Sequence, residues 1–315
     1  MKCTFCGTDE VVYVRPYDKI ALCKEHFNEQ FEKRVKRTIN RYKMFQRKDK
    51  IAVGVSGGKD SIALLNTLVK IEKDFPESEI VAITIDEGIE GYREEGLYYA
   101  KKHTKRLNVK HYIFSFKEDF GYSLDEIIKK LGERGGKNRA YGACSYCGIL
   151  RRKILNAAAK TVGANVVATG HNLEDEAETV LLNIIRGDVN RLGRQSPYPK
   201  KVHKDLIPRV KPFRLTPQAE IVMYMVINGV DYQEVACPYA VEAYRGNVRN
   251  FIFETQNSQP MLSFNIVKAQ DKLIPYLAKN KEETKGKIKS CKICGDPSAS
   301  EICKACSLKE QLSNL

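Results

Sequence analysis

The chain has 315 residues, of which 43% are hydrophobic, so it can bury a substantial core as one large domain or two to three smaller ones. Its 53 Lys and Arg residues outnumber its 39 Asp and Glu residues. The resulting formal charge of +14 favours a polyanionic partner, nucleic acid first, over a small neutral one. A solvated basic surface, or the charge-rich composition typical of growth at high temperature, would give the same excess.

A membrane protein is not expected. No run of about 18 apolar residues could span a bilayer, and Met1-Lys2-Cys3 does not resemble the start of a signal peptide. We therefore expect a cytoplasmic protein. In that reducing compartment the ten cysteines indicate metal or sulfur chemistry rather than structural disulfides.

Two groups of metal-ligand residues lie at the ends of the chain. They are Cys3, Cys6, Cys23 and His26 near the N-terminus, and Cys291, Cys294, Cys303 and Cys306 near the C-terminus. Each group supplies four ligands, enough for a closed tetrahedral Zn²⁺ site with no open position for a substrate. Free thiols on a small loop are the weaker alternative, because segments of about 25 residues cannot build a core alone. We predict two zinc modules, over residues 1–30 and 290–315.

A basic amphipathic helix is predicted next, over residues 31–50. Apolar side chains recur at helical spacing from the end of the first module onward, at Phe27, Phe31, Val35, Ile39, Tyr42 and Phe45. Lys and Arg occupy the other faces. These cations either contact RNA phosphates or form a solvated face, and the pattern does not decide between the two.

From residue 51 onward, apolar strand-like runs alternate with helical stretches. The predicted strands are 51–55, 80–85, 111–116 and 165–169, and the predicted helices are 62–73, 91–107 and 149–162. This alternation predicts an α/β domain over residues 51–278, with a parallel sheet covered by helices on both faces. Ligands of such sheets gather at the carboxyl ends of the strands. The lysine-rich stretch 279–289 is expected to be a solvated linker.

The first predicted strand runs through Gly54 and Val55 into Ser56-Gly57-Gly58-Lys59-Asp60-Ser61, and a predicted helix follows. A strand that enters a glycine turn and leaves as a helix aims backbone N–H groups and a positive helix end at one point, where a phosphate can bind. The spacing is neither that of an ordinary P-loop nor that of a dinucleotide-binding turn. A glycine turn without a ligand is the weak alternative.

Polar residues also follow two other predicted strands. Asp86, after Ile85, is placed to meet the ribose or adenine of a nucleotide, or else is a turn or helix-cap residue. Gly170-His171-Asn172 precedes three acidic residues, of which Asp175 is the strongest candidate. Carboxylates at this helix start could bind a metal ion that bridges phosphates, although the helix dipole alone favours acids there.

The remaining cysteines are Cys144 and Cys147, placed in a predicted glycine-rich loop, and Cys237. Three thiolates are one fewer than a closed four-cysteine cluster needs, so a metal centre held by them would keep an open position. A [4Fe-4S] cluster, a persulfide relay and a zinc site all remain open. A core cysteine beside an inert CxxC pair is the remaining alternative.

Together these residues carry a family resemblance. SGGKDS resembles the PP-loop of the ATP pyrophosphatases. With the CxxC pair, the GHNxxDE segment, Cys237-Pro238 and the two terminal groups, the whole chain resembles the tRNA 2-thiouridine synthetases of the TtuA group. The resemblance implies an adenine nucleotide α-hydrolase-like PP-loop domain between two zinc modules. It also implies that a tRNA uridine is adenylated on O2 with ATP and that this oxygen is replaced by sulfur, with the T-loop 5-methyluridine favoured as the target.

The resemblance assigns cofactors, partners and residues. It implies ATP, Mg²⁺, a [4Fe-4S] cluster on Cys144, Cys147 and Cys237, two Zn²⁺ ions, a thiocarboxylated ubiquitin-like sulfur carrier and a homodimer. The expected nucleotide-binding residues are Gly54, Val55, Ser56, Gly57, Gly58, Asp60, Ser61, Ile85, Asp86, Gly170 and His171. The family's catalytic aspartate corresponds to Asp175, and Lys59 is expected to be a further catalytic residue. The family's catalytic lysine falls on Arg151, which cannot act as a base, so Lys153 is a possible substitute.

Several alternatives remain. Within the class they are thiolation of the wobble uridine and of an anticodon-loop cytidine. A PP-loop ATP pyrophosphatase that makes an amide or lysidine would not need three central cysteines. A non-catalytic zinc-finger RNA-binding protein would need only the basic surface and the terminal groups, because phosphate contacts supply affinity without specifying sequence.

Overall fold

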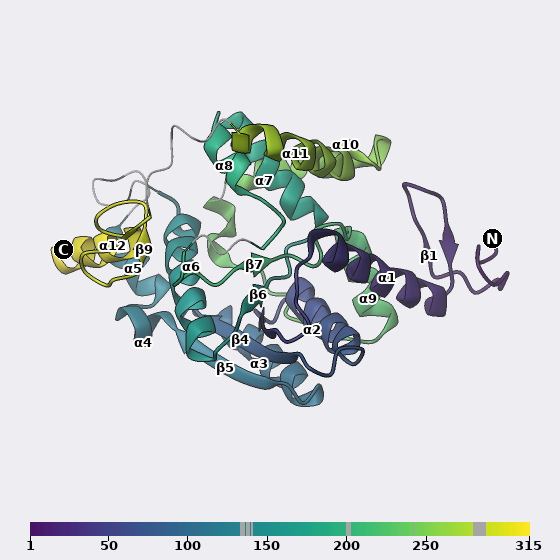
Figure 1. Ribbon diagram of the computed structural model, residues 1–315, viewed down its shortest axis with the longest axis horizontal. Coiled ribbons are helices and arrows are strands. Elements are labelled where there is room, and N and C mark those ends of the chain that lie inside the picture. The colour runs from purple at the N-terminus through teal and green to yellow at the C-terminus, as the bar shows by residue number, and fades with distance from the viewer. Residues whose placement is uncertain (133–135, 137–138, 140, 200–202, 243, 280–287) are drawn as a thin grey trace.

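The computed structural model describes residues 1–132, 136, 139, 141–199, 203–242, 244–279 and 288–315. Within them, a five-stranded parallel sheet has the order β5-β4-β3-β6-β7 (Figure 1). The strands are β3 (Lys50–Gly54), β4 (Glu79–Asp86), β5 (Lys110–Ser115), β6 (Val166–Ala168) and β7 (Arg209–Val210). The predicted α/β class is confirmed. β7 was not predicted, because two residues are too few to show a strand pattern.

Both faces of the sheet are buried, which is why its central strands are apolar without interruption. Ile51 and Val53 of β3 face one core, together with α1, α2 and α9. Ala52 faces a second core on the opposite side, together with α5, α6 and α12. Alternate side chains of one strand thus enter different cores. A third cluster joins α7, α10 and α11, which lie together at the top of Figure 1.

The helices cover the sheet and its carboxyl edge. They are α1 (Lys24–Tyr42), α2 (Lys59–Glu72), α3 (Arg93–Arg106), α4 (Phe116–Phe120), α5 (Leu124–Leu131), α6 (Ala143–Thr161), α7 (Leu173–Ile185), α8 (Val189–Arg194), α9 (Gln218–Ile227), α10 (Arg245–Ser258), α11 (Leu262–Lys279) and α12 (Lys304–Ser313), with the 3-10 helix η1 (Pro238–Glu242). None of the helices in these described ranges is long and apolar enough to cross a membrane.

Helix α6 begins six residues earlier than the predicted 149–162. Gly142 occupies its N-cap position, and the helix runs from Ala143 through both cysteines of the CxxC pair. The interpretation of this segment as a glycine-rich loop was therefore wrong. Ala143, Cys147 and Leu150 repeat at helical spacing and are buried in the second core, so tertiary packing holds this glycine-flanked turn as helix.

The two terminal groups of ligands lie at opposite ends of the molecule in Figure 1. Near the N-terminus, β1 (Tyr13–Val14) pairs with β2 (Ala21–Leu22), and Cys23 is the N-cap residue of α1. Near the C-terminus, β8 (Lys289–Ser290) pairs with β9 (Pro297–Ser298). Most of the predicted linker, residues 280–287, lies outside the described residues.

Helix α1 has the predicted amphipathic character, but it runs over Lys24–Tyr42 and not over the predicted 31–50. It ends there because Lys43 adopts a left-handed backbone conformation, and Lys50 already begins β3. Phe27, Phe31 and Val35 are buried on its apolar stripe. Part of its basic side is occupied by the protein itself, because Arg34 pairs with Glu220 at 3.3 Å and Lys36 pairs with Asp74 at 2.7 Å. Arg34 is thus held by a buried carboxylate, whereas the pair of Lys36 is exposed and contributes little stability.

Candidate active site

The SGGKDS segment forms a tight turn between β3 and α2, whose N-cap residue is Gly58. Gly57 has φ +96°, and a Cβ atom there would lie 2.2 Å from the carbonyl oxygen of Gly96. Only glycine fits this position. The hydroxyl of Ser61 accepts a hydrogen bond from the backbone N–H of Ser56 at 3.0 Å and donates to the carbonyl of Gly58 at 2.9 Å. The turn is therefore held in shape before any ligand binds.

A paired substitution tests this packing. Gly57→Ala is expected to lower the free energy of unfolding by about 2 kcal/mol more than Gly91→Ala. Both glycines have positive φ, but a Cβ at Gly91 would meet no atom within 4 Å. The comparison thus separates the clash with Gly96 from the cost of a left-handed backbone. Urea unfolding of both variants measures the difference, and equal losses would show that the loop can move away from Gly96.

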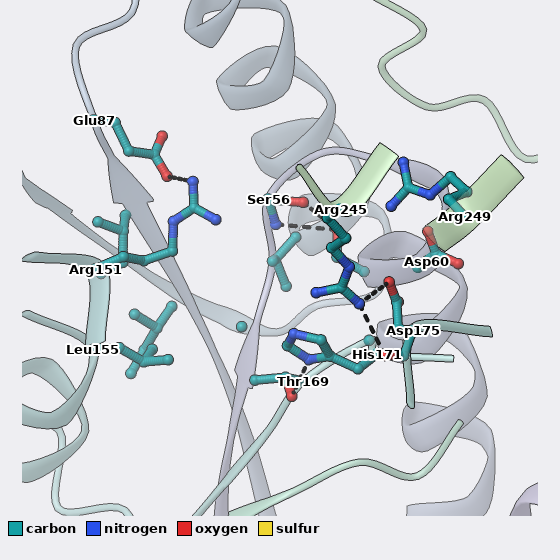
Figure 2. A pocket seen from close by; sticks show the side chains of 16 residues that line it. Ser56, Asp60, Glu87, Arg151, Leu155, Thr169, His171, Asp175, Arg245 and Arg249 are labelled. Atoms are coloured by element: carbon teal, nitrogen blue, oxygen red, sulfur yellow. Dashed lines mark hydrogen bonds and ion pairs between the residues drawn. The ribbon is translucent and has the colours of Figure 1, made fainter. Parts of the chain in front are cut away.

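A cavity of about 350 Å³ opens at the carboxyl edge of the sheet, above this turn (Figure 2). Its walls hold eight of the predicted nucleotide-binding residues. They are Gly54, Val55, Ser56, Asp60, Ser61, Ile85, Gly170 and His171. Asp175, Arg151 and Glu87 line it as well, together with Arg245 and Arg249. The structure therefore brings together the residues that follow three different strands, as a parallel sheet requires.

Three predicted nucleotide-binding residues are not among the lining side chains. Gly57 and Gly58 belong to the turn beneath the cavity and have only backbone to offer. Asp86 accepts a hydrogen bond from the backbone N–H of Gly88 at 2.8 Å, which is the turn role left open by the sequence. Lys59 pairs with Asp60 at 2.9 Å and so lies beside the turn.

The loop after β6 packs directly on the turn. A Cβ atom on Gly170 would lie 2.8 Å from the carbonyl oxygen of Asp60, so glycine allows the close approach. The side-chain amide of Asn172 donates to the Asp60 carboxylate at 3.1 Å. Asn172 also caps α7, where its side chain and that of Asp175 form a capping box. One amide thus links Asp60 and Asp175.

Two arginines that the sequence did not point to complete this side of the cavity. Arg245 contacts the Asp175 carboxylate at 3.2 Å and donates to its carbonyl oxygen at 2.8 Å (Figure 2). Arg249 pairs with the buried Glu178 at 2.9 Å. The only signal in the sequence is their spacing of four residues, which places both on one face of α10. Arg245 also pairs with Glu178, so this one buried carboxylate holds both arginines at the cavity wall.

His171 contributes no charge at neutral pH. Its Nδ1 lies 2.9 Å from the hydroxyl of Thr169, and the ring reaches into the cavity (Figure 2). Desolvation by the surrounding protein lowers the pKa of His171 to about 3, and the cations Lys211 and Arg245 act in the same direction. The imidazole is therefore neutral and serves as a hydrogen-bonding group.

On the opposite wall, Arg151 bridges the cavity and the cysteine centre. Its guanidinium pairs with Glu87 at 2.8 Å and donates to the Cys147 sulfur at 3.3 Å. Glu87 is 3% exposed and also faces Arg93 at 3.3 Å. The Glu87 carboxylate raises the pKa of Arg151, so Arg151 stays charged. Glu87 was not predicted, because its partner Arg151 is distant in the chain and no sequence pattern links the two.

Lys153 does not line this cavity, so the prediction that it substitutes for a catalytic lysine was wrong. Lys153 is two residues after Arg151, so its side chain extends from a different face of α6. There it forms an ion pair with Asp296 and lies 3.2 Å from the sulfur of Cys294. Its contacts join α6 to the C-terminal ligand group, where they are structural.

The three central cysteines converge although 90 residues separate Cys147 from Cys237. Cys144 and Cys147 lie in the first turn of α6, and Cys237 immediately precedes η1, where the Cys144 sulfur lies 3.8 Å from the carbonyl of Tyr239. Burial raises the pKa of Cys147 to about 11, and charge on Cys144 or Cys237 acts in the same direction, as expected of neighbouring sulfurs. The three thiols therefore lie near one another, and three cysteine ligands would leave one iron of a [4Fe-4S] cluster open.

The ligand atoms of each terminal group lie closer together than the three central sulfurs do. In each of them the four ligand atoms all lie within 4.8 Å of one another, as ligands of one ion do. Within the described residues the three central cysteines do not form such a close group, which suits a larger centre. Backbone N–H groups of Cys294 and Cys303 lower the pKa of Cys291 to about 6, favouring the thiolate that a metal binds.

Comparisons with known proteins give the same picture. Residues 27–256 match the PP-loop domain family, and residues 2–28 match the N-terminal LIM domain of the 2-thiouridine synthetase TtuA. The chain is 37% identical over 316 residues to cytoplasmic tRNA 2-thiolation protein 1 of Saccharomyces cerevisiae, covering 98% of this chain and 86% of the relative. It is 34% identical over 303 residues to a probable sulfurtransferase of Methanocaldococcus jannaschii, covering 96% and 85%.

The fold is also shared with a solved structure. The U34-tRNA thiolase NcsA from Methanococcus maripaludis, with its [4Fe-4S] cluster, superposes with a TM-score of 0.83 at 32% identity, covering 99% of this chain and 96% of that one. The family and the enzyme class predicted from the sequence are thereby confirmed. The chain belongs to the PP-loop family of tRNA 2-thiolation proteins and is a tRNA sulfurtransferase.

Proposed function

We propose that this protein uses ATP to activate the C2 carbonyl of uridine 34 in tRNA and replaces its oxygen with sulfur. The observation that carries the proposal is the bridge made by Arg151, which joins a cavity built on SGGKDS to a three-cysteine centre. The sequence favoured the T-loop as target. The similarity to a U34 thiolase over 99% of the chain supports the wobble position instead.

The residues around the cavity fit ATP in one orientation, with its phosphates at the SGGKDS turn. The SGGKDS turn and the N-terminus of α2 offer backbone N–H groups and a positive helix end to the phosphates. Asp60 and Asp175 lie on the same wall, linked through Asn172, and we assign them to Mg²⁺, which prefers such oxygen ligands. Arg245 and Arg249 then face the phosphates from α10. The base lies toward Ile83 and Ile85.

The reaction divides into two steps. The uridine O2 attacks the α-phosphorus of ATP, the bond to the bridging oxygen breaks and pyrophosphate leaves. A sulfur nucleophile then adds to C2, the C2–O2 bond breaks, and AMP leaves with that oxygen. The protein's part is to stabilise charge: Arg245 and Arg249 on the pyrophosphate side, and Arg151 between the reacting carbon and the cysteines.

The central cysteines are proposed as cluster ligands. Cys144, Cys147 and Cys237 would hold a [4Fe-4S] cluster, whose iron without a cysteine would present sulfur to the activated base. Arg151, at 3.3 Å from the Cys147 sulfur, balances part of the negative charge of this centre. We assign two Zn²⁺ ions to the terminal groups, where closed four-ligand sites are structural.

Glu87 is proposed as a positioning residue for Arg151. Glu87→Gln is expected to lower the turnover number about tenfold to a hundredfold, because the bridging guanidinium loses its anchoring charge. The KM for tRNA should not change. Steady-state thiolation kinetics check this, with Glu90→Gln, an exposed acid nearby, as the matched control. A rise in KM with unchanged turnover would show that Glu87 acts in binding instead.

The experiment for the target maps the thionucleoside. Purified protein, reconstituted anaerobically with iron and sulfide, is incubated with ATP, Mg²⁺, sulfide and tRNA, and the product is digested and analysed by mass spectrometry. We expect 2-thiouridine at position 34 and none in a tRNA with cytidine there. Thiolation of the T-loop uridine would overturn the position but keep the activity. No thiolation under any of these conditions would overturn the function.

We also propose, from the resemblance, a thiocarboxylated ubiquitin-like carrier as sulfur donor, a homodimer, and a cytoplasmic site of action. Replacing sulfide by such a carrier in the same assay tests the donor. Light scattering at several protein concentrations tests the homodimer.

A further inference from the structure

A second cleft lies beside the active site, between α6, the strand β7 and the C-terminal module. Its volume is about 350 Å³. Figure 1 shows α6 next to the C-terminal elements β9 and α12, which form the far wall. Its polar lining includes Arg152, Lys153, Arg209, Lys304, Asp296 and Ser300. None of these side chains has a part in the proposed chemistry.

The cleft carries uncompensated positive charge. Its carboxylate, Asp296, is already paired with Lys153. Among the residues that the structure describes, Arg152, Arg209 and Lys304 have no ion-pair partner. One guanidinium nitrogen of Arg209 donates to the backbone carbonyl of Arg152 at 2.9 Å, so the Arg209 side chain is held against the backbone of Arg152.

The pKa shifts of the two arginines show that these cations lie close to one another. Desolvation lowers the pKa of Arg152, and the neighbouring Arg191 and Arg151 act in the same direction. Desolvation likewise lowers the pKa of Arg209, with Arg152 as the second cause. The side chains of Arg152, Arg209 and Lys304 are exposed, so they are accessible to a ligand from solvent, and a bound anion would offset their mutual repulsion. The arrangement is thus built for a ligand that carries negative charge.

The chemistry and position of the cleft identify the anion. A guanidinium presents a planar fork of N–H donors that matches phosphate oxygens, and two such forks with a lysine can hold consecutive phosphates of a chain. Arg151, which lines the nucleotide cavity, lies close enough to Arg152 for its charge to act on it. A polynucleotide held by Arg152 would therefore pass the mouth of the active site.

We propose that Arg152, Arg209 and Lys304 form a phosphate-binding cleft for the tRNA backbone, with the C-terminal module as one wall. This deepens the proposed function and rests on it for the identity of the polyanion. It gives the C-terminal module a task beyond its own folding, because the module's Lys304 closes the cleft opposite α6.

The test uses full-length protein with both arginines replaced, Arg152→Ala with Arg209→Ala. Its affinity for tRNA is measured by fluorescence anisotropy at several salt concentrations. We expect Kd to rise about tenfold and the slope of log K against log salt to fall by roughly two, one for each phosphate that the variant no longer binds. Lys105→Ala, which removes an exposed cation on α3, is the matched control and should leave both unchanged.

Three further measurements keep the test decisive. ATP affinity and the iron–sulfur absorption of the double variant should match those of the parent, which shows that the fold is kept. Replacing both arginines by lysine should restore most of the salt slope but less of the affinity, because the forked geometry is lost. Lys304→Ala alone, which removes an exposed side chain at the start of α12, should lower the slope by roughly one if the double variant fails to fold.

Unchanged tRNA affinity and slope in the double variant would overturn the proposal. Loss of carrier-dependent thiolation with full tRNA affinity would also overturn it and assign the cleft to an acidic protein. Failure of the proposed function gives a different result, since the parent protein itself would then not thiolate tRNA.

Discussion

Replacing Cys237 by serine is expected to abolish tRNA thiolation, by a factor of about 10³ or more, together with the iron–sulfur absorption. Cys237 is the one central cysteine that does not lie on α6, so its loss removes a ligand without breaking that helix. Serine oxygen is a poor iron ligand where a thiolate is needed. ATP affinity should stay within about twofold, because Cys237 does not line the nucleotide cavity.

The measurement combines anaerobic reconstitution, absorption and EPR spectra, and the thiolation assay. Ser145→Ala, an exposed change between the two cysteines of α6, is the matched control and should keep both cluster and activity. Activity retained in Cys237→Ser without any cluster would refute the cluster assignment and favour a persulfide relay between Cys144 and Cys147. Activity and cluster both retained would remove Cys237 from the centre.

Asp175→Asn is expected to lower thiolation about 10³-fold while tRNA affinity stays within about twofold. Asparagine can still accept the hydrogen bond from the backbone N–H of Asn172 that completes the α7 cap, so the helix start is kept. What is lost is the charge that faces Arg245 at 3.2 Å and the proposed Mg²⁺. Asp175→Ala would lose the reciprocal hydrogen bond of the capping box as well, at about 1 kcal/mol of stability, while Asn172 would still cap the helix.

Glu174→Gln is the matched control. Glu174 is the residue before Asp175, but its carboxylate turns away to accept hydrogen bonds from Gln218 and Gln256. Its thiolation rate should stay within about threefold of the parent rate. If Asp175→Asn lost tRNA binding and thermal stability along with activity, the role of Asp175 would be in folding and not in the reaction.

The features that short stretches of chain encode could be predicted from the sequence. The SGGKDS turn needs only Gly57 and Gly58 between a strand and a helix, and each terminal ligand group is complete within about 25 residues. Three strands of the sheet, β3, β4 and β6, were found because both of their faces are buried, which makes them uniformly apolar. The edge strand β5 was found from its run of strand-forming residues, although its side chains are exposed or only half-buried.

Contacts between residues far apart in the chain could not be predicted from the sequence. Arg245 meets Asp175 across 70 positions and Glu87 meets Arg151 across 64, and neither pair has a pattern that links its members. The start of α6 was missed for a related reason, since the burial of Ala143 and Cys147 against other elements outweighs the glycines around them. The same packing turns Lys153 toward the C-terminal module.

By itself, then, the sequence determined the chemistry available: a phosphate-binding turn, two four-residue groups that could hold a metal ion and three more thiols, because each depends on residue type and local spacing. Only the tertiary structure decided which charges surround that chemistry. The partners of Arg151, Asp175, Arg152 and Arg209 are set by how α6, α7, α10 and β7 pack on one sheet, and that packing is fixed by burial of apolar faces far apart in the chain.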